Sequence, residues 1–254
     1  MLQVNNIHTV FNAGTINEKH ALKGVSLTLE DGDFVTVIGG NGAGKSTLLN
    51  AIAGTYPVDA GEILIDGINV TKLPEHKRAQ YLGRVFQDPM NGTAATMEIQ
   101  ENLALAKRRG KVRTLMPGIT KAEKAEYREL LKILDLGLES RMTAKVGLLS
   151  GGQRQAITLL MASLKQPKLL LLDEHTAALD PKTAAKVLET TDKIVSQNHL
   201  TTLMITHNMH DAIKFGTRLI MLNKGKIVMD ISQEEKLKTS HDDLIKEFIK
   251  LEGV

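Results

Sequence analysis

Three short runs of apolar residues stand out along the chain. They are DFVTVIGG, PKLLLLDE and TTLMITHN, which begin at Asp33, Pro167 and Thr201. Continuous apolar runs of this length are typical of strands buried on both faces of a parallel sheet. Helical stretches lie between them, one after Gly44 and one over residues 153–164. The alternation predicts an α/β fold with right-handed crossovers.

The N-terminal part of the chain follows a different pattern. LQVNNIHTVF, LKGVSLTLEDGD and GEILIDGINV show β-branched alternation, with Asp-Gly pairs at Asp31–Gly32 and Asp66–Gly67. Such segments predict antiparallel strands joined by tight turns. RLIMLNKGKIVMD, further along, predicts a hairpin that turns at Lys224–Gly225. We therefore expect an antiparallel β layer beside the parallel sheet.

Strong strand signals are missing over residues 90–147. TKAEKAEYRELLKILDLG opens instead with a capping pattern, Thr120 followed by Glu123, and continues with apolar residues at helical spacing. A mostly helical subdomain inserted into the core is expected here. The predicted organisation is a single domain, 1–254, with the α/β core and its β layer at about 1–89 and 148–235, the helical subdomain at about 90–147, and a C-terminal helix at about 236–254 that begins near Ser240.

Composition narrows the functional classes. The chain has 254 residues, 42% of them hydrophobic and 24% charged, which is ordinary for a globular domain. Its net charge of +3 is too small to favour a nucleic-acid partner. The lack of cysteine excludes disulfides and thiolate metal sites. There is no secretory signal and no apolar run long enough to span a bilayer, so we expect a cytoplasmic protein.

GGNGAGKST fits the pattern G-x-x-x-x-G-K-[ST] and stands between a predicted buried strand and a helix. Glycines let the loop curl so that its N–H groups face phosphate oxygens, and the helix N-terminus adds a positive dipole. Lys45 is expected to reach the β- and γ-phosphates, and Ser46 to ligate Mg²⁺. The alternative is a glycine-rich turn without a ligand. The predicted ATP-binding loop comprises Gly39, Gly40, Asn41, Gly42, Ala43, Gly44, Lys45, Ser46 and Thr47.

Two acidic residues end the run LLLLDE. Asp173 stands at the carboxyl end of a predicted strand, where open α/β sheets bind ligands, and is expected to hold the Mg²⁺ shell. Glu174 follows and is expected to act as a general base on the attacking water. Alternatively, the two are surface carboxylates in a loop.

LLSGGQRQA, from Leu148, places two glycines between a serine and a glutamine at the start of a predicted helix. With the phosphate loop and the acidic pair, this segment makes the whole chain resemble an ATP-binding-cassette (ABC) ATPase, the P-loop subunit of a membrane transporter. The resemblance implies that Ser150, Gly151, Gly152 and Gln153 meet the γ-phosphate held by a second copy of the chain. The alternative for Ser150 is a simple helix N-cap.

The resemblance implies roles for four more residues. Gln87 in RVFQDP would contact Mg²⁺ or the attacking water, and His207 in MITHN would touch the γ-phosphate. Asp180 in TAALD would run across the dimer interface, and Phe11 would stack on adenine. A lone histidine is more often structural, and an isolated phenylalanine is more often core. The chain departs from the family at two positions. His175 stands where proline is common, and its imidazole could shift the pH dependence of the neighbouring base. Ala177 stands where serine is common.

A transporter ATPase without a membrane segment implies separate permease subunits and, indirectly, an extracellular substrate-binding protein. A chain of this kind resembles bacterial importers, and RVFQDPMNGTAATMEIQENLALAKRRG resembles those assigned to amino acids, including tryptophan or tyrosine. It would then lie peripherally on the inner face of the membrane. Met90, Met97, Ile99 and Leu103 are expected in the docking groove, or alternatively in the subdomain core. The competing functions are a soluble ABC ATPase, such as an iron–sulfur assembly factor, and a nucleic-acid-associated one.

Overall fold

The computed structural model describes residues 1–110, 118–238 and 246. A six-stranded sheet forms its centre, in the order β10-β9-β3-β8-β7-β6. Strands β3, β6, β7, β8 and β9 pair in parallel, and only β10 is antiparallel to its neighbour. The strands span β3 Phe34–Ile38, β6 Leu82–Val85, β7 Leu169–Asp173, β8 Thr202–Ile205, β9 Arg218–Asn223 and β10 Lys226–Ile231.

A smaller antiparallel sheet lies beside the first, in the order β2-β1-β4-β5. This is the predicted β layer. The Asp66–Gly67 pair joins β4 to β5 with positive φ at both residues, and Lys224–Gly225 does the same between β9 and β10. Asp31–Gly32 differs, because it lies between β2 and β3, which belong to different sheets and form no hairpin. The strands span β1 Leu2–Phe11, β2 Lys19–Leu29, β4 Ala60–Ile65 and β5 Ile68–Asn69.

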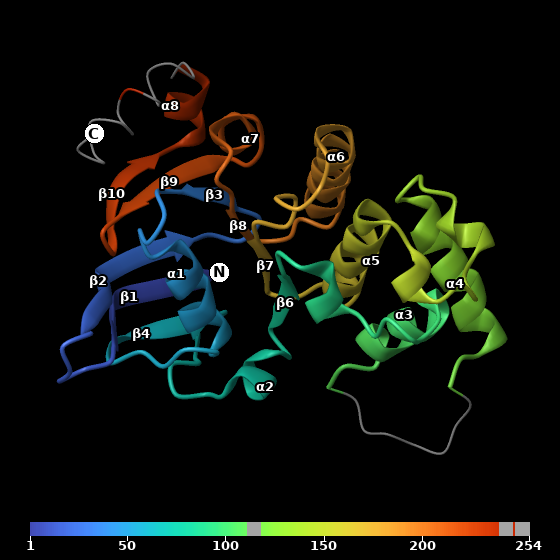
Figure 1. The fold of residues 1–254 in the computed structure, drawn as a ribbon, viewed down its shortest axis with the longest axis horizontal. Coiled ribbons are helices and arrows are strands. Elements are labelled where there is room, and N and C mark those ends of the chain that lie inside the picture. The colour runs from blue at the N-terminus through green and yellow to red at the C-terminus, as the bar shows by residue number, and fades with distance from the viewer. Residues whose placement is uncertain (111–117, 239–245, 247–254) are drawn as a thin grey trace.

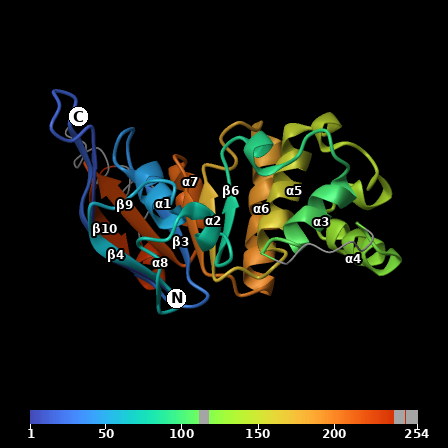
Figure 2. The same ribbon diagram turned by 90° about the horizontal axis from the view of Figure 1, so that it is seen from below.

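Helices cover both faces of the six-stranded sheet. Helix α1 packs between the two sheets, while α5 and α6 lie against the opposite face, with α3 and α4 beyond them at the far end of the molecule (Figures 1 and 2). The α/β class is therefore confirmed. The helices span α1 Lys45–Ala53, α2 Glu75–Arg78, α3 Ile99–Lys107, α4 Lys121–Lys132, α5 Gly151–Ser163, α6 Pro181–Gln197, α7 Met209–Lys214 and α8 Gln233–Lys238.

The four leucines of β7 show why this strand reads as a continuous apolar run. Leu169 and Leu171 pack into the cluster shared with α1 and the β layer. Leu170 and Leu172 point to the other face and pack into the cluster shared with α3, α4, α5 and α6. Because successive side chains of a strand alternate between faces, a strand covered on both sides needs apolar residues at every position.

The helical subdomain shares its core with the sheet. Between residues 90 and 147 the described part of the chain contains α3, α4 and short 3-10 turns, with one isolated bridge between Glu98 and Lys145. Thr120 and Glu123 form the expected capping box at the start of α4. Helix α5, beyond the predicted boundary, packs against α3, so the boundaries stay a prediction.

The predicted C-terminal helix lies almost wholly outside the described residues. So does the apolar face that helical spacing in the sequence predicts for it, at Leu244, Ile245, Phe248 and Leu251. None of the helices in the described part of the chain combines the length and apolar character that crossing a bilayer requires.

Candidate functional site

The loop between β3 and α1 is pressed against neighbouring backbone at two glycines. Gly39 has φ +152°, and a Cβ there would lie 2.3 Å from the carbonyl oxygen of Leu222. Gly44 has φ +109°, and its Cβ would lie 2.8 Å from the carbonyl oxygen of Ala21. Only glycine fits both the conformation and the space. The surrounding strands therefore fix the path of the loop.

The start of α1 is open to an anion. The first N–H groups of a helix have no intrahelical acceptor, and here Gly44 is the N-cap, so no capping side chain accepts from them either. The buried Lys45 folds back over the loop, and its Nζ donates to the carbonyls of Gly39 at 2.6 Å and Gly40 at 3.2 Å. Free N–H groups, a positive helix end and an ammonium together fit a phosphate chain.

A cleft of about 210 Å³ opens over this loop. Phe11, at the end of β1, lines it, and its ring meets the ring of Tyr56 edge to face, with centroids 5.3 Å apart. Phe11 is thus part of the cleft and not of the buried core. Lys19 also lines the cleft, although no sequence pattern singled out Lys19 or Tyr56. Further lining residues include all of the loop from Gly40 to Thr47, and Glu174.

The carboxyl ends of β6, β7 and β8 lie next to one another at one edge of the sheet, where open α/β sheets bind ligands. Gln87 follows β6 and is exposed. Glu174 follows β7, and His207 follows β8; His207 Nδ1 lies 3.5 Å from Glu174 Oε2. Glu174 has φ +43°, a strained conformation for a residue with a side chain. The sheet thus brings Glu174 and His207 together.

Asp173, the last residue of β7, lies behind Glu174 in a half-buried position. Burial raises the pKa of its carboxyl group, and the guanidinium of Arg84 counters part of that rise. Arg84 Nη2 lies 3.7 Å from Asp173 Oδ2, an ion pair too long for a hydrogen bond. The carboxylate oxygens therefore keep their capacity to accept hydrogen bonds from other groups.

The donors at this edge suit Mg²⁺ that arrives with a phosphate ligand. Within residues 1–110, 118–238 and 246 there is no cluster of three or more His, Cys, Asp or Glu side chains that could hold a metal. The oxygens of Ser46 and Asp173 are hard donors of the kind Mg²⁺ prefers. Because Mg²⁺ commonly takes only one or two protein ligands beside phosphate and water, this sparse set fits it.

His175 cannot act as the pH-sensitive neighbour that its position suggested. The ring is buried, which lowers its pKa to about 4. Its Nε2 lies 3.1 Å from Thr191 Oγ1, and that hydroxyl already donates to the carbonyl of Val187. The neutral ring therefore carries its proton on Nε2 and donates it to Thr191. The expected influence on the pH dependence of Glu174 near neutrality is wrong.

The LSGGQ segment forms the start of α5. Ser150 is the N-cap: the N–H of Gln153 donates to Ser150 Oγ, and the N–H of Ser150 donates to Gln153 Oε1. The N-cap reading is thus confirmed. Gly152 has its own reason, because a Cβ there would lie 2.0 Å from the Thr183 methyl group of α6. Gly151 and Ser150 are exposed, and the segment does not line the cleft at Lys45.

Asp180 is the N-cap of α6. Its Oδ1 accepts from the N–H of Thr183 at 3.1 Å, and hydrogen bonds from Thr183 lower the pKa of its carboxyl group. Asp180 is exposed, like Ser150. It therefore has a local structural role in the single chain.

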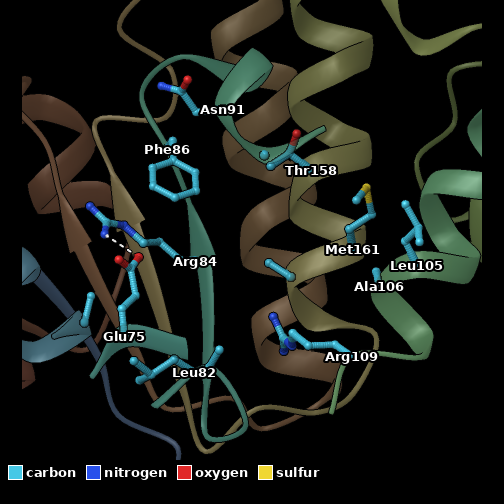
Figure 3. Close-up of a pocket in the computed structure, with 14 residues that line it drawn as sticks. Glu75, Leu82, Arg84, Phe86, Asn91, Leu105, Ala106, Arg109, Thr158 and Met161 are labelled. Atoms are coloured by element: carbon cyan, nitrogen blue, oxygen red, sulfur yellow. Dashed lines mark ion pairs between the residues drawn. The ribbon is translucent and has the colours of Figure 1, made fainter. Parts of the chain in front are cut away.

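A groove of about 390 Å³ lies between the sheet edge at β6 and the helices α3 and α5 (Figure 3). Phe86 lines it on the β6 side, near Arg84 and Glu75, and Leu105 lines it on the α3 side. Four residues were expected from the sequence to line a docking groove, but none of them lines this one: Met90, Met97, Ile99 and Leu103. Ile99 and Leu103 are fully buried in the helical cluster, as the alternative reading has it.

The chain is similar to known proteins over most of its length. The family model described as "ABC transporter" matches residues 22–177. The tyrosine transport ATP-binding protein of Clostridioides difficile is 45% identical over 249 residues, which cover 98% of each chain. The methionine import ATP-binding protein MetN of Bartonella henselae is 32% identical, over 99% of this chain and 70% of that protein.

Solved structures give the same result at the level of the fold. The dimeric post-hydrolysis structure of an ATP-binding cassette bound to ADP and Pi matches with a TM-score of 0.78 and 30% sequence identity. The match covers 92% of this chain and 99% of the other.

Proposed function

This chain belongs to the ABC transporter family and is an ATP-hydrolysing cassette, and we propose that it energises the import of an amino acid through separate membrane permease subunits. The observation that carries the proposal is the 45% identity to a tyrosine transport ATP-binding protein over 98% of both chains. An aromatic amino acid such as tyrosine or tryptophan is the proposed cargo.

In the proposed reaction, ATP lies in the cleft above the phosphate loop. Adenine stacks on Phe11, and the N–H groups from Gly39 to Thr47, together with Lys45, bind the phosphates. Ser46, Gln87 and Asp173 would hold Mg²⁺, which would supply charge neutralisation for the phosphate oxygens. Glu174 takes a proton from water as the water oxygen bonds to the γ-phosphorus and the bond to the β-phosphate oxygen breaks. His207 binds the γ-phosphate.

The second half of the site comes from another copy of the chain. The segment over residues 150–153 forms a helix N-terminus outside the cleft of its own chain. Ser150 and Gly151 are exposed, Gln153 is half-buried and Gly152 is buried. A two-fold dimer would place them on the γ-phosphate of the partner, with Asp180 at the interface. The dimeric state of the related cassette bound to ADP and Pi supports this arrangement.

The groove beside Phe86 is the proposed docking site for a short helix of the permease. It has a volume of about 390 Å³ and combines apolar lining residues with charged ones. The cassette would thereby lie on the inner face of the membrane, and an extracellular binding protein would deliver the amino acid to the permease. No nucleic-acid partner is proposed.

Two variants test the ATPase assignments. Glu174→Gln should hydrolyse ATP at least about 100-fold more slowly while it still binds ATP, because the proton acceptor is lost and the phosphate loop is intact. Lys45→Ala should bind ATP more weakly in calorimetry. Unchanged hydrolysis in Glu174→Gln, or unchanged affinity in Lys45→Ala, would contradict the corresponding role.

The importer assignment has its own test. The genes next to this one should encode a permease and a secreted binding protein, and the purified binding protein should bind tyrosine or tryptophan in calorimetry. A stable complex with iron–sulfur scaffold proteins, and none with a permease, would favour the soluble-factor alternative instead.

A further inference from the structure

The guanidinium of Arg84 lies between the docking groove and Asp173. Its side chain lines the groove together with Glu75 and Phe86 (Figure 3). Nη1 lies 3.8 Å from Glu75 Oε1, and Nη2 lies 3.7 Å from Asp173 Oδ2. A single guanidinium therefore stands between a carboxylate at the groove wall and the carboxylate at the nucleotide edge.

The guanidinium is held in place by neighbours other than these two carboxylates. Nη2 donates to Asn50 Oδ1 at 2.7 Å, and Nη1 donates to Thr55 Oγ1 at 3.1 Å. The ring of Phe86 stacks on it, with 4.5 Å between the guanidinium carbon and the ring centroid. Asn50 belongs to α1, the helix that begins at Lys45. The position of the charge thus depends on both the phosphate-loop helix and the groove wall.

The side chain is held tightly and at a cost. Arg84 and Asp173 have exposed side-chain fractions of 13% and 16%, so their attraction is only weakly screened by water. Arg84 Nε is buried without an acceptor. A buried donor left unpaired is unfavourable, and the remaining contacts must offset that cost. Movement of Phe86 or Glu75 would therefore shift the guanidinium, and the attraction between Arg84 and Asp173 would change.

We propose that Arg84 is a positioning residue that couples the docking groove to the Asp173 carboxylate. This inference rests on the proposed function, in which Asp173 serves Mg²⁺ and the groove receives the permease. Arg84 acts on the nucleotide site only through Asp173: it holds the carboxylate at the end of β7 in one orientation. Whatever packs on Phe86 in the groove changes that orientation, and by reciprocity Mg²⁺ binding changes the environment of Phe86.

The coupling can be read from the groove side by fluorescence. The chain contains no tryptophan, so Phe86→Trp places a single indole over the guanidinium. In the Glu174→Gln background, where bound ATP persists, we expect the emission to change when Mg²⁺ is added to the ATP-loaded protein. Adding Arg84→Leu should abolish that change, while calorimetry without Mg²⁺ shows the same ATP affinity. An emission change that survives in Arg84→Leu, or one that never occurs, would overturn the proposal.

The effect can also be read from the nucleotide side. Groups that orient a metal-bound carboxylate typically affect metal affinity by 10–100-fold, so Arg84→Leu should raise the Mg²⁺ concentration for half-maximal hydrolysis about tenfold. Arg84→Lys keeps the charge but not the two hydrogen bonds of the guanidinium, so its Mg²⁺ requirement should lie between those of the wild type and Arg84→Leu. It also serves if the leucine variant fails to fold. Equal Mg²⁺ requirements in the wild type and in Arg84→Lys and Arg84→Leu would contradict the coupling.

A matched control removes an arginine elsewhere. Arg128 is exposed on α4, and Arg128→Leu should leave both the fluorescence response and the Mg²⁺ requirement unchanged. Normal hydrolysis in Glu174→Gln would reject the proposed function. If Glu174→Gln is inactive but the Arg84 variants leave both the emission change and the Mg²⁺ requirement as in the wild type, the coupling alone is rejected.

Discussion

His207 Nδ1 lies 3.5 Å from Glu174 Oε2, although the two residues follow different strands of the sheet. The side chain of His207 is 61% exposed and that of Glu174 is 21% exposed, so the histidine covers the carboxylate from the open side of the edge. The pair is held by the parallel pairing of β7 with β8 and by the bond from the Glu174 N–H to the carbonyl of Ile205.

Replacement of His207 should slow hydrolysis without weakening nucleotide binding. His207→Ala removes the group proposed to bind the γ-phosphate and leaves the phosphate loop intact, so we expect the turnover rate to fall about 100-fold, the scale of a single positioned catalytic group. A steady-state phosphate-release assay and ATP calorimetry measure the two quantities. His210→Ala, a change in the exposed histidine of the following helix, is the control and should be neutral. Unchanged turnover in His207→Ala would remove His207 from the reaction.

Phe11 should contribute to ATP affinity through its ring. Loss of a stacked aromatic commonly costs about 1–3 kcal/mol per base, so Phe11→Ala should weaken ATP binding by about tenfold or more. Phe11→Tyr keeps the ring and the edge-to-face contact with Tyr56, and should bind like the wild type. Equal ATP affinities of all three proteins in calorimetry would leave Phe11 outside the adenine site.

Gly152 should be needed for the packing of α5 on α6. The Cβ of Gly152→Ala would lie 2.0 Å from Thr183 Cγ2, and overpacking of this kind costs about 1–3 kcal/mol. Thr183→Ser removes that methyl group. In a double-mutant cycle followed by urea unfolding, Thr183→Ser should therefore recover most of the stability that Gly152→Ala loses. Additive losses in the double variant would show that the clash is not the cause.

Burial of His175 should make the protein less stable in mild acid. The unfolded residue takes up a proton near pH 6.5, but the folded one does so only at about 4. Unfolding therefore takes up a proton in this interval, and stability is complete above about pH 6.5 and declines as the pH falls toward 4. The decline amounts to about 3 kcal/mol. Urea titrations of the wild type and of His175→Leu between pH 4 and 7 measure it, and equal slopes would contradict the assignment.

The sheet could be predicted wherever a strand is buried on both faces. The runs that became β3, β7 and β8 carry apolar residues at consecutive positions, because each position meets a packed layer. Strand β6 did not stand out, since it is four residues long and includes Gly83 and Arg84. Arg84 forms ion pairs with Glu75 and Asp173, but in the sequence it cannot be distinguished from an exposed charged residue.

The site was predictable where motifs are local and not where contacts are distant. The phosphate loop and the capping box of Ser150 depend on residues within a few positions. By contrast, the contact of Tyr56 with Phe11, the clash of Gly152 with Thr183 and the placement of Arg84 join segments far apart in sequence, for which one sequence offers no periodic signal. The same limit explains why the two alternatives for Ile99 and Leu103, docking groove or subdomain core, could not be decided from the sequence; the structure buries both residues.

The central claim is that ATP joins the phosphate loop of one copy to Ser150 of another. Light scattering of Glu174→Gln with Mg²⁺ and ATP tests it most directly, with Ser150→Phe added in the same background. The matched control is Thr120→Phe, because Thr120 caps α4 with a capping box of the same kind and is also exposed. We predict a dimer for Glu174→Gln and for its Thr120→Phe version, and a monomer with ATP still bound for its Ser150→Phe version. An ATP-loaded monomer in Glu174→Gln, or an undisturbed dimer in the Ser150→Phe version, would contradict the account.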